Sequence, residues 1–339
     1  MKKQSLHLLV TLAVVGLLFS MTGCKKDSNN STDAGTNNAG PFYPVTVFVL
    51  GPSGNAQGGA SLELVNPPSD SSIFKATTDS TGKGTVLSPT GAHVILARMG
   101  SVWQATINVN VAALVTGNMA GAVTLQQNTT LGKVLVVFAG CETLEQVLRD
   151  TAIRYYKYDS TTVSQMRSQA NTDSNALLTF LKQYSIVFSD CNCGDEYGFP
   201  LLARIYGRYV SQGGKMYGGH YNYYNLQFIF PPNYKSSTSN ANDSLLITDS
   251  RLSTAVGYTV IKWPAYTGYE KFTDLPAGTS TVYAVFFGTP GSATSPTGVP
   301  VIVENRLGTG KYLWTVYHNQ DILADTRLVR IVRYFLYAM

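Results

Sequence analysis

Apolar and polar residues follow four successive patterns along this chain of 339 residues. Residues 6–19 form a short, mostly apolar run, and residues 25–40 contain no large apolar residue. From residue 44 to residue 130, short runs rich in β-branched residues alternate with turn residues. After residue 131, continuous apolar strands alternate with segments at helical spacing. The patterns predict a leader, a flexible tether, an all-β domain and an α/β domain.

The all-β domain is expected over residues 44–130. Its runs alternate apolar and polar residues, which is typical of strands with one buried face, and Gly, Pro, Asn and Asp separate them. Short strands at regular spacing favour a sandwich of two sheets, of the prealbumin-like or Ig-like kind. The expected strands are 45–50, 60–65, 84–87, 93–97, 104–109 and 121–125.

The α/β domain is expected over residues 131–339. Residues 133–139 lack polar alternation, which is typical of a strand buried on both faces of a parallel sheet. Alternating strands and helices of this kind build a doubly wound, flavodoxin-like sheet with helices on both faces. Further strands are expected at 185–189, 215–217, 281–287, 299–304 and 311–316, helices at 143–148, 175–182, 199–210 and 325–336, and a solvated loop at 231–243.

The start of the chain resembles a bacterial lipoprotein leader. Two lysines precede the apolar run, and Thr22 and Gly23 come directly before Cys24. This order is typical of a secretory signal, and the run is too short to span a membrane. The resemblance to the lipobox implies that residues 1–23 are removed and that Cys24 carries acyl chains such as palmitate. The alternative is an ordinary signal peptide with an incidental cysteine.

Composition limits the expected partners. Without Lys2 and Lys3 the basic residues fall from 25 to 23 against 20 acidic ones, so the net charge falls from +5 to +3. The positive charge forms no basic run, which argues against nucleic-acid binding. Charged residues are only 13% of the chain, as in β-rich secreted proteins. We expect a protein of the bacterial outer membrane or cell surface, held in the membrane by lipid on Cys24 and a tether over residues 24–43.

The all-β domain resembles the carboxypeptidase-regulatory-like modules of secreted bacterial proteins. The similarity rests on the order of strands and turns around Thr78-Asp-Ser-Thr-Gly82. It implies a spacer or docking module. His93 lies within an alternating strand, where a structural role is expected, and we find no catalytic cluster in this domain.

The α/β domain resembles the class I glutamine-amidotransferase-like superfamily, and within it the trehalose-utilisation-protein-like branch. One matching segment has Tyr209-Val210 and Gly213-Gly214 at the end of a helix, then a strand and Gly218-Gly219-His220. The other runs from Gly308-Thr-Gly-Lys311 to Tyr317-His318. Together these segments imply an amidotransferase-like fold over most of residues 133–339.

Two departures argue against amidotransferase chemistry. Members of the superfamily with that activity carry a cysteine at the sharp turn after the strand that ends near Tyr217, where this chain has Gly218-Gly219-His220. They also carry His-Pro-Glu after the late strand, where this chain has His318-Asn319-Gln320. An amide cannot stabilise an imidazolium as a carboxylate does, so the catalytic triad is not intact.

The candidate site is the carboxyl edge of the sheet, where open α/β sheets bind their ligands. His220 and His318 are both expected there, and the candidate ligand-binding residues are Gly219, His220, Tyr221, Tyr223, His318 and Asn319. A polar pocket for carbohydrate is one hypothesis, because tyrosine stacks on sugar rings. A hydrolase or sugar-modifying enzyme using both histidines is a second, and a structural or partner-binding envelope protein is a third. No cofactor is expected, and no metal, because no tight ligand spacing is present around Asp190, Asp195, Glu196 or Asp321.

Three further cysteines lie in the α/β domain. Cys141 follows the first expected strand, and Cys191 and Cys193 follow the next major one. These two strands are neighbours in the superfamily, so the resemblance implies a disulfide from Cys141 to Cys191 or Cys193. The remaining thiol would be a lone cysteine beside the candidate site.

Overall fold

The computed structural model describes residues 41–113, 118–139, 144, 148, 157–190, 199–230, 235–241, 244–262, 266–275, 278–287, 299–316 and 325–339. The predicted leader, Cys24 and all of the tether before residue 41 lie outside these residues. Among the described residues no helix is both long and apolar enough to cross a bilayer.

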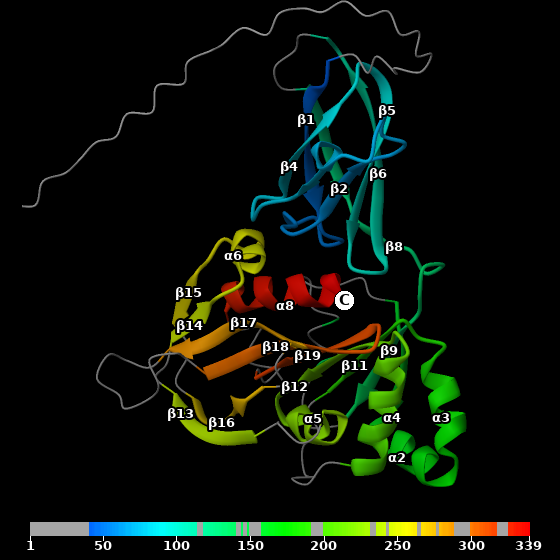
Figure 1. Ribbon diagram of the computed structural model, residues 1–339, viewed down its shortest axis with the longest axis vertical. Helices are drawn as coiled ribbons and strands as arrows, with labels where there is room; N and C mark the ends of the chain where they lie inside the picture. The colour runs from blue at the N-terminus through cyan, green and yellow to red at the C-terminus, as the bar shows by residue number, and fades with distance from the viewer. Residues whose placement is uncertain are drawn as a thin grey trace, which may run out of the picture. The chain divides into compact units, whose positions relative to one another are not determined.

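Residues 43–127 form two sheets (Figure 1). Alternation places every second residue of the first strand in the core, so Val45, Val47 and Val49 are buried. The strands predicted between residues 45 and 125 are all present, whereas the type of β domain stays a prediction. One sheet has the order β4-β1-β7 and the other β3-β2-β5-β6-β8. The bounds are β1 Tyr43–Leu50, β2 Ser61–Leu64, β3 Lys75–Thr77, β4 Lys83–Ser88, β5 Gly91–Met99, β6 Trp103–Val111, β7 Asn118–Thr124 and β8 Gln126–Gln127, with a 3-10 turn η1 at Ser72–Phe74.

The rest of the described chain is built on a nine-stranded mixed sheet, which confirms the predicted α/β class. Its order is β10-β9-β11-β12-β19-β18-β17-β14-β15, and the first five strands are parallel. In chain order these five strands are arranged 2-1-3-4-5, which is the flavodoxin-like arrangement. The bounds are β9 Val134–Phe138, β10 Asp159–Thr162, β11 Ile186–Ser189, β12 Lys215–Gly219, β14 Ser244–Ile247, β15 Val260–Lys262, β17 Ser280–Phe287, β18 Val299–Leu307 and β19 Gly310–Thr315.

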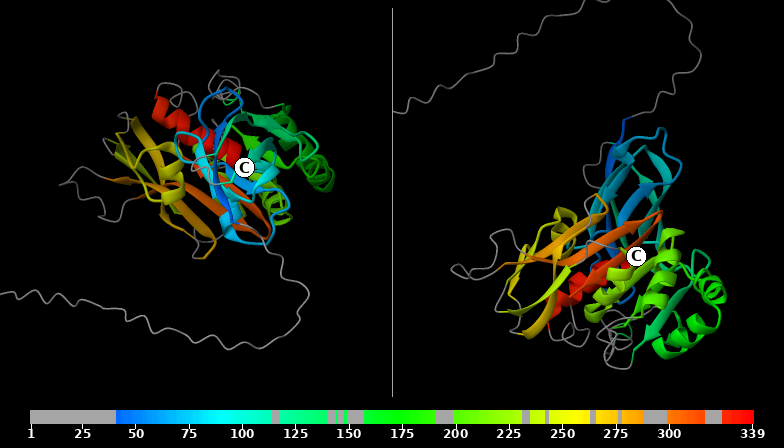
Figure 2. Two further views of the ribbon diagram at one scale, coloured as in Figure 1. Left: turned by 90° about the horizontal axis from the view of Figure 1, so that it is seen from above. Right: turned by 60° about the horizontal axis from the view of Figure 1, so that its bottom comes forward.

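Helices cover both faces of this sheet, with α4 on one face and α8 on the other (Figures 1 and 2). Leu144 and Leu148 are buried helical residues, as their spacing of four predicts. Local signals set the helix ends: α2 begins with a capping box of Thr162 and Gln165, and α4 begins with Pro200. The bounds are α2 Val163–Thr172, α3 Ser174–Leu181, α4 Pro200–Ser211, α5 Tyr223–Ile229, α6 Ser250–Val256 and α8 Thr326–Ala338, with a 3-10 turn η2 at His220–Asn222.

The prediction of a solvated loop at 231–243 is wrong for residues 235–241. These residues form β13 (Lys235–Ala241), which pairs antiparallel with β16 (Tyr266–Asp274) as a separate two-stranded sheet. The segment Lys-Ser-Ser-Thr-Ser-Asn-Ala has almost no apolar residue, so hydrophobic periodicity gives no signal there. Its partner strand supplies the backbone hydrogen bonds that define it.

The last helix contacts the turn that joins β5 to β6. The ring centroids of Trp103 and Tyr337 lie 5.0 Å apart in an edge-to-face arrangement. Gly100 has φ +59°, and a Cβ there would lie 2.1 Å from the carbonyl oxygen of Tyr337. The carbonyl of Met339 accepts hydrogen bonds from Ser101 Oγ and from Lys215 Nζ, both at 2.7 Å. The close approach of the two backbones therefore requires glycine at position 100.

Asp325 caps α8, and its loss should destabilise the protein in a pH-dependent way. Its carboxylate accepts from the backbone N–H of Arg327 at 2.8 Å and lies 2.6 Å from Arg327 Nη2. The hydrogen bond from the Arg327 side chain holds the pKa of Asp325 below its usual value of 3.8. Because the folded pKa is depressed, this stabilisation is present above about pH 4 and is lost as the pH falls through the folded pKa. We expect Asp325→Ala to cost about 0.5–2 kcal/mol at neutral pH in urea unfolding.

The matched variant Asp325→Asn keeps a capping oxygen and removes the charge. Its cost relative to wild type should be below about 1 kcal/mol and should disappear in acid, because a partly exposed ion pair contributes little. A cost of Asp325→Asn that persists below the folded pKa would contradict the assigned role of the charge.

Candidate functional site

The two segments singled out in the sequence lie side by side in the sheet. Strands β12 and β19 pair in parallel, with Gly218 opposite Trp314 and Gly219 opposite Thr315. Strand β11 is the other neighbour of β12, with Ser189 opposite Gly218. The carboxyl ends of all three strands therefore meet at one edge, as the sequence predicted. His318 and Asn319 follow β19 but lie outside the described residues.

His220 comes directly after β12 and begins the turn η2. Its side chain is only 1% exposed, and its backbone carbonyl accepts a hydrogen bond from Trp314 Nε1 at 2.9 Å. Trp314 is itself fully buried on β19. This bond ties the turn after β12 to the neighbouring strand. A side chain this buried has little contact with solvent, so ligand binding through the His220 ring stays a prediction.

A buried polar cluster holds the same turn against β11. The Asn222 amide nitrogen donates to the carbonyl oxygens of Asp190 at 2.6 Å and of Ser189 at 3.3 Å. Its amide oxygen accepts from Ser189 Oγ at 3.1 Å and from Asn225 Nδ2 at 3.0 Å. These four residues are at most 2% exposed. Buried polar groups require such partners, so the cluster fixes the position of the turn at the sheet edge.

The strand before the turn approaches its neighbours too closely for a side chain. A Cβ on Gly218 would lie 2.4 Å from the Tyr312 hydroxyl and 2.8 Å from Asn222 Cβ. The adjacent Tyr217 hydroxyl lies 3.0 Å from Thr315 Oγ1. Burial raises the pKa of Tyr206 on α4, so its hydroxyl stays protonated at neutral pH.

The predicted site residues are brought together only in part. Gly219 and His220 lie at the edge, and the backbone of Tyr221 and Tyr223 follows in η2 and α5, whereas the side chains of both tyrosines are outside the described part of the chain. Cys141, Cys191 and Cys193 are also outside it, so the disulfide stays a prediction. In the part of the chain that the structure describes, no three His, Cys, Asp or Glu side chains form a metal-binding group.

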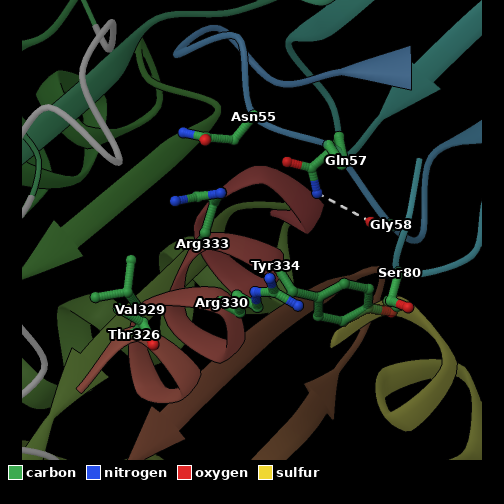
Figure 3. Close-up of a pocket in the computed structure, with 11 residues that line it drawn as sticks. Asn55, Gln57, Gly58, Ser80, Thr326, Val329, Arg330, Arg333 and Tyr334 are labelled. Atoms are coloured by element: carbon green, nitrogen blue, oxygen red, sulfur yellow. Dashed lines mark hydrogen bonds between the residues drawn. The ribbon is translucent and has the colours of Figure 1, made fainter. Parts of the chain in front are cut away.

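Sequence reasoning missed Ser189, Asn222 and Asn225 as members of the edge. The available signal was local: a Ser-Asp pair ends a buried strand, and an asparagine follows the Gly-Gly-His turn. It also missed a pocket of about 540 Å³ beside α8, which Arg330 and Arg333 line (Figure 3). These arginines occupy positions i and i+3 of an amphipathic helix, a spacing that by itself indicates only a shared face.

Comparisons with known proteins leave the family open. No family model matches the chain, and no curated protein matches it. Among solved structures, a GMP synthase component from Thermoplasma acidophilum matches at 13% identity, with a TM-score of 0.41 and coverage of 60% of this chain and 92% of that one. PurLQS from Thermotoga maritima matches at 11% identity, with a TM-score of 0.39 and coverage of 60% and 97%.

A third match is a β-galactosidase from Bacillus circulans sp. alkalophilus, at 13% identity and a TM-score of 0.33. The match covers 61% of this chain but only 30% of that enzyme. All three matches have a sequence identity below 25% and a TM-score below 0.5. The fold assignment therefore rests on the strand order of the sheet, and none of these activities transfers to this chain.

Proposed function

We propose that this chain is a lipid-anchored envelope protein whose α/β part binds a polar ligand, with carbohydrate as the expected class, and does not carry out amidotransfer. The observation that carries this proposal is the residue directly after β12. Amidotransfer would need a cysteine nucleophile at that turn. The residue at this position is His220, whose side chain is buried.

Among the described side chains, the hydroxyl groups near this turn do not replace the missing thiol. Tyr217 and Thr315 are hydrogen-bonded to each other, and Ser189 is bonded to Asn222. A nucleophile needs an adjacent base that can take its proton, and these partners are a phenol, an alcohol and an amide. The burial of His220 supports a structural role for that ring over acid–base catalysis. These contacts therefore argue against catalysis by the described groups at this turn.

The carboxyl edge supports a binding role because of where it lies. In flavodoxin-like sheets, ligands bind outside the carboxyl ends of the strands. The hydrogen bonds of Asn222 and Trp314 hold the edge in one conformation, so a ligand would meet a preformed surface. Tyr221 and Tyr223 follow the edge in sequence and would supply flat faces for sugar rings. The β unit would then serve as a carboxypeptidase-regulatory-like spacer between the membrane and this site.

A glycan screen tests the proposal. We expect Tyr223→Ala to weaken binding of a glycan found in the screen by about 1–3 kcal/mol, since it removes one stacking face and its hydroxyl. Tyr43→Ala is the matched control, because Tyr43 begins β1 in the three-stranded sheet, away from the carboxyl edge of the nine-stranded sheet. Equal effects of the two variants, or no glycan bound at all, would count against the proposal. A thermal melt of each variant separates lost binding from lost folding.

A further inference from the structure

The pocket beside α8 is built from parts of the chain that are distant in sequence. Helix α8 contributes Arg330, Arg333 and Tyr334, the loop between β1 and β2 contributes Asn55 and Gln57, and the turn before β4 contributes Ser80. Figure 3 shows these side chains around a common space, with both guanidinium groups on the α8 side. The volume of about 540 Å³ lies within the range of small-molecule sites.

The pocket lining carries positive charge. Arg330 and Arg333 both line it, and no Asp or Glu is among the lining residues in the described part of the chain. Two nearby carboxylates are paired with other arginines: Asp249 lies 2.9 Å from Arg251, and Asp325 lies 2.6 Å from Arg327. These two carboxylates therefore do not cancel the charge of Arg330.

Arg330 is placed so that it can meet a ligand. It is exposed, its Nη1 lies 3.4 Å from the carbonyl oxygen of Val256, and its guanidinium carbon lies 5.6 Å from the centre of the Tyr258 ring. Among the described residues it forms no ion pair with a carboxylate. Arg333 is only 9% exposed, so it provides a guanidinium with restricted motion in the wall of the pocket.

The opposite wall is rigid and polar. Gln57 is 3% exposed, and its amide nitrogen donates to the Gly58 carbonyl at 2.9 Å. A Cβ on Gly58 would lie 2.1 Å from the carbonyl oxygen of Ala255, so the loop lies directly against α6. On the α8 side, burial raises the pKa of Tyr334, so its hydroxyl remains protonated at neutral pH. The pocket is thus formed before any ligand enters, which lowers the entropic cost of binding.

We propose that this pocket binds a small polar molecule that carries an oxyanion, either carboxylate or phosphate, with Arg330 as the main contact and Arg333 in the adjacent wall. The planar guanidinium group of arginine forms paired hydrogen bonds with both kinds of oxyanion. Asn55 and Ser80 offer neutral hydrogen-bonding groups for the body of the molecule. The proposal is independent of glycan binding at the carboxyl edge, because none of the residues that form that edge lines this pocket.

Calorimetric titration of the mature full chain tests the proposal. The probes are inorganic phosphate, glucuronate and, as a neutral control, glucose. We expect one-site binding of at least one anion and no binding of glucose. Arg330→Gln should weaken anion binding roughly tenfold or more. Arg330→Lys should recover part of the loss, because lysine restores the positive charge but not the paired hydrogen bonds of a guanidinium group. Binding of only phosphate or only glucuronate would identify the kind of oxyanion.

Arg204→Gln is the matched control, because it removes the same charge from an exposed helical position on α4, outside the pocket lining. It should change anion affinity less than about twofold at physiological salt, where the screening length is about 8 Å. Arg333→Gln should also weaken binding, and a melt shows whether this buried variant folds. If Arg333→Gln does not fold, the variants of the exposed Arg330 test the proposal by themselves.

Three results would overturn the proposal: no heat with either anion at millimolar concentration, equal affinity in Arg330→Gln and wild type, or equal binding of glucose. Tyr223→Ala separates the two proposed sites, since it should leave anion affinity unchanged. Weaker anion binding in a folded Tyr223→Ala variant would mean that the anion binds elsewhere.

Discussion

Cys24→Ser is expected to move the protein from the membrane fraction to the soluble fraction. Serine has no thiol, so it cannot receive the lipid that the lipobox resemblance implies for Cys24. Each buried methylene of an acyl chain contributes about 0.8 kcal/mol to membrane attachment, so the loss of the acyl chains removes most of the binding energy. Fractionation of cells that express either form, followed by immunoblotting, measures the effect.

Cys141→Ser is the matched control for this experiment, because it makes the same substitution in the α/β part and leaves Cys24 intact. That variant should remain with the membrane. Recovery of Cys24→Ser in the membrane at the wild-type level would reject the lipid anchor and favour an ordinary signal peptide.

Trp314→Ala is expected to lower the free energy of unfolding by about 3–5 kcal/mol. Trp314 is fully buried on β19, where it lies opposite Gly218 on one side and Val303 on the other. Truncation would leave a large cavity in the centre of the sheet. It would also remove the donor to the buried carbonyl of His220, which costs energy in addition to the lost packing. Urea unfolding followed by circular dichroism measures the change.

Trp314→Phe separates these two contributions. Phenylalanine keeps much of the apolar volume but lacks the indole N–H, so we expect a clearly smaller cost than for alanine. The remaining cost should include about 1–3 kcal/mol for the unsatisfied carbonyl. A loss below about 1 kcal/mol for Trp314→Ala would show that the turn after β12 does not depend on this residue.

The two proposed sites would serve different ligands on one scaffold. The carboxyl edge is held by neutral hydrogen bonds of Asn222 and Trp314. The pocket beside α8 has two guanidinium groups and no lining carboxylate among the described residues. A neutral glycan suits the first surface and an anion suits the second, so the glycan and anion titrations address them separately.

Hydrophobic periodicity by itself determined most of the strands and three of the main helices. Strands such as β9 and β19 bury both faces, and α8 buries one stripe of side chains, so burial leaves a clear repeat in the sequence. The same reasoning failed for β13, because a polar strand is defined by its partner β16 and leaves no such repeat. Short helices such as α5 and α6 were also missed, since seven residues carry too little periodicity.

The meeting of β12 and β19 could be predicted because parallel strands of one sheet end at the same edge. Only the tertiary structure decided that the His220 side chain is buried and that Asn222 joins the turn to β11. Burial of one side chain depends on what other segments place around it, and those contacts have no local signature. The same holds for the pocket: Gln57 and Arg333 are 276 residues apart (333 − 57) and become neighbours only when α8 folds against the first β-sheets.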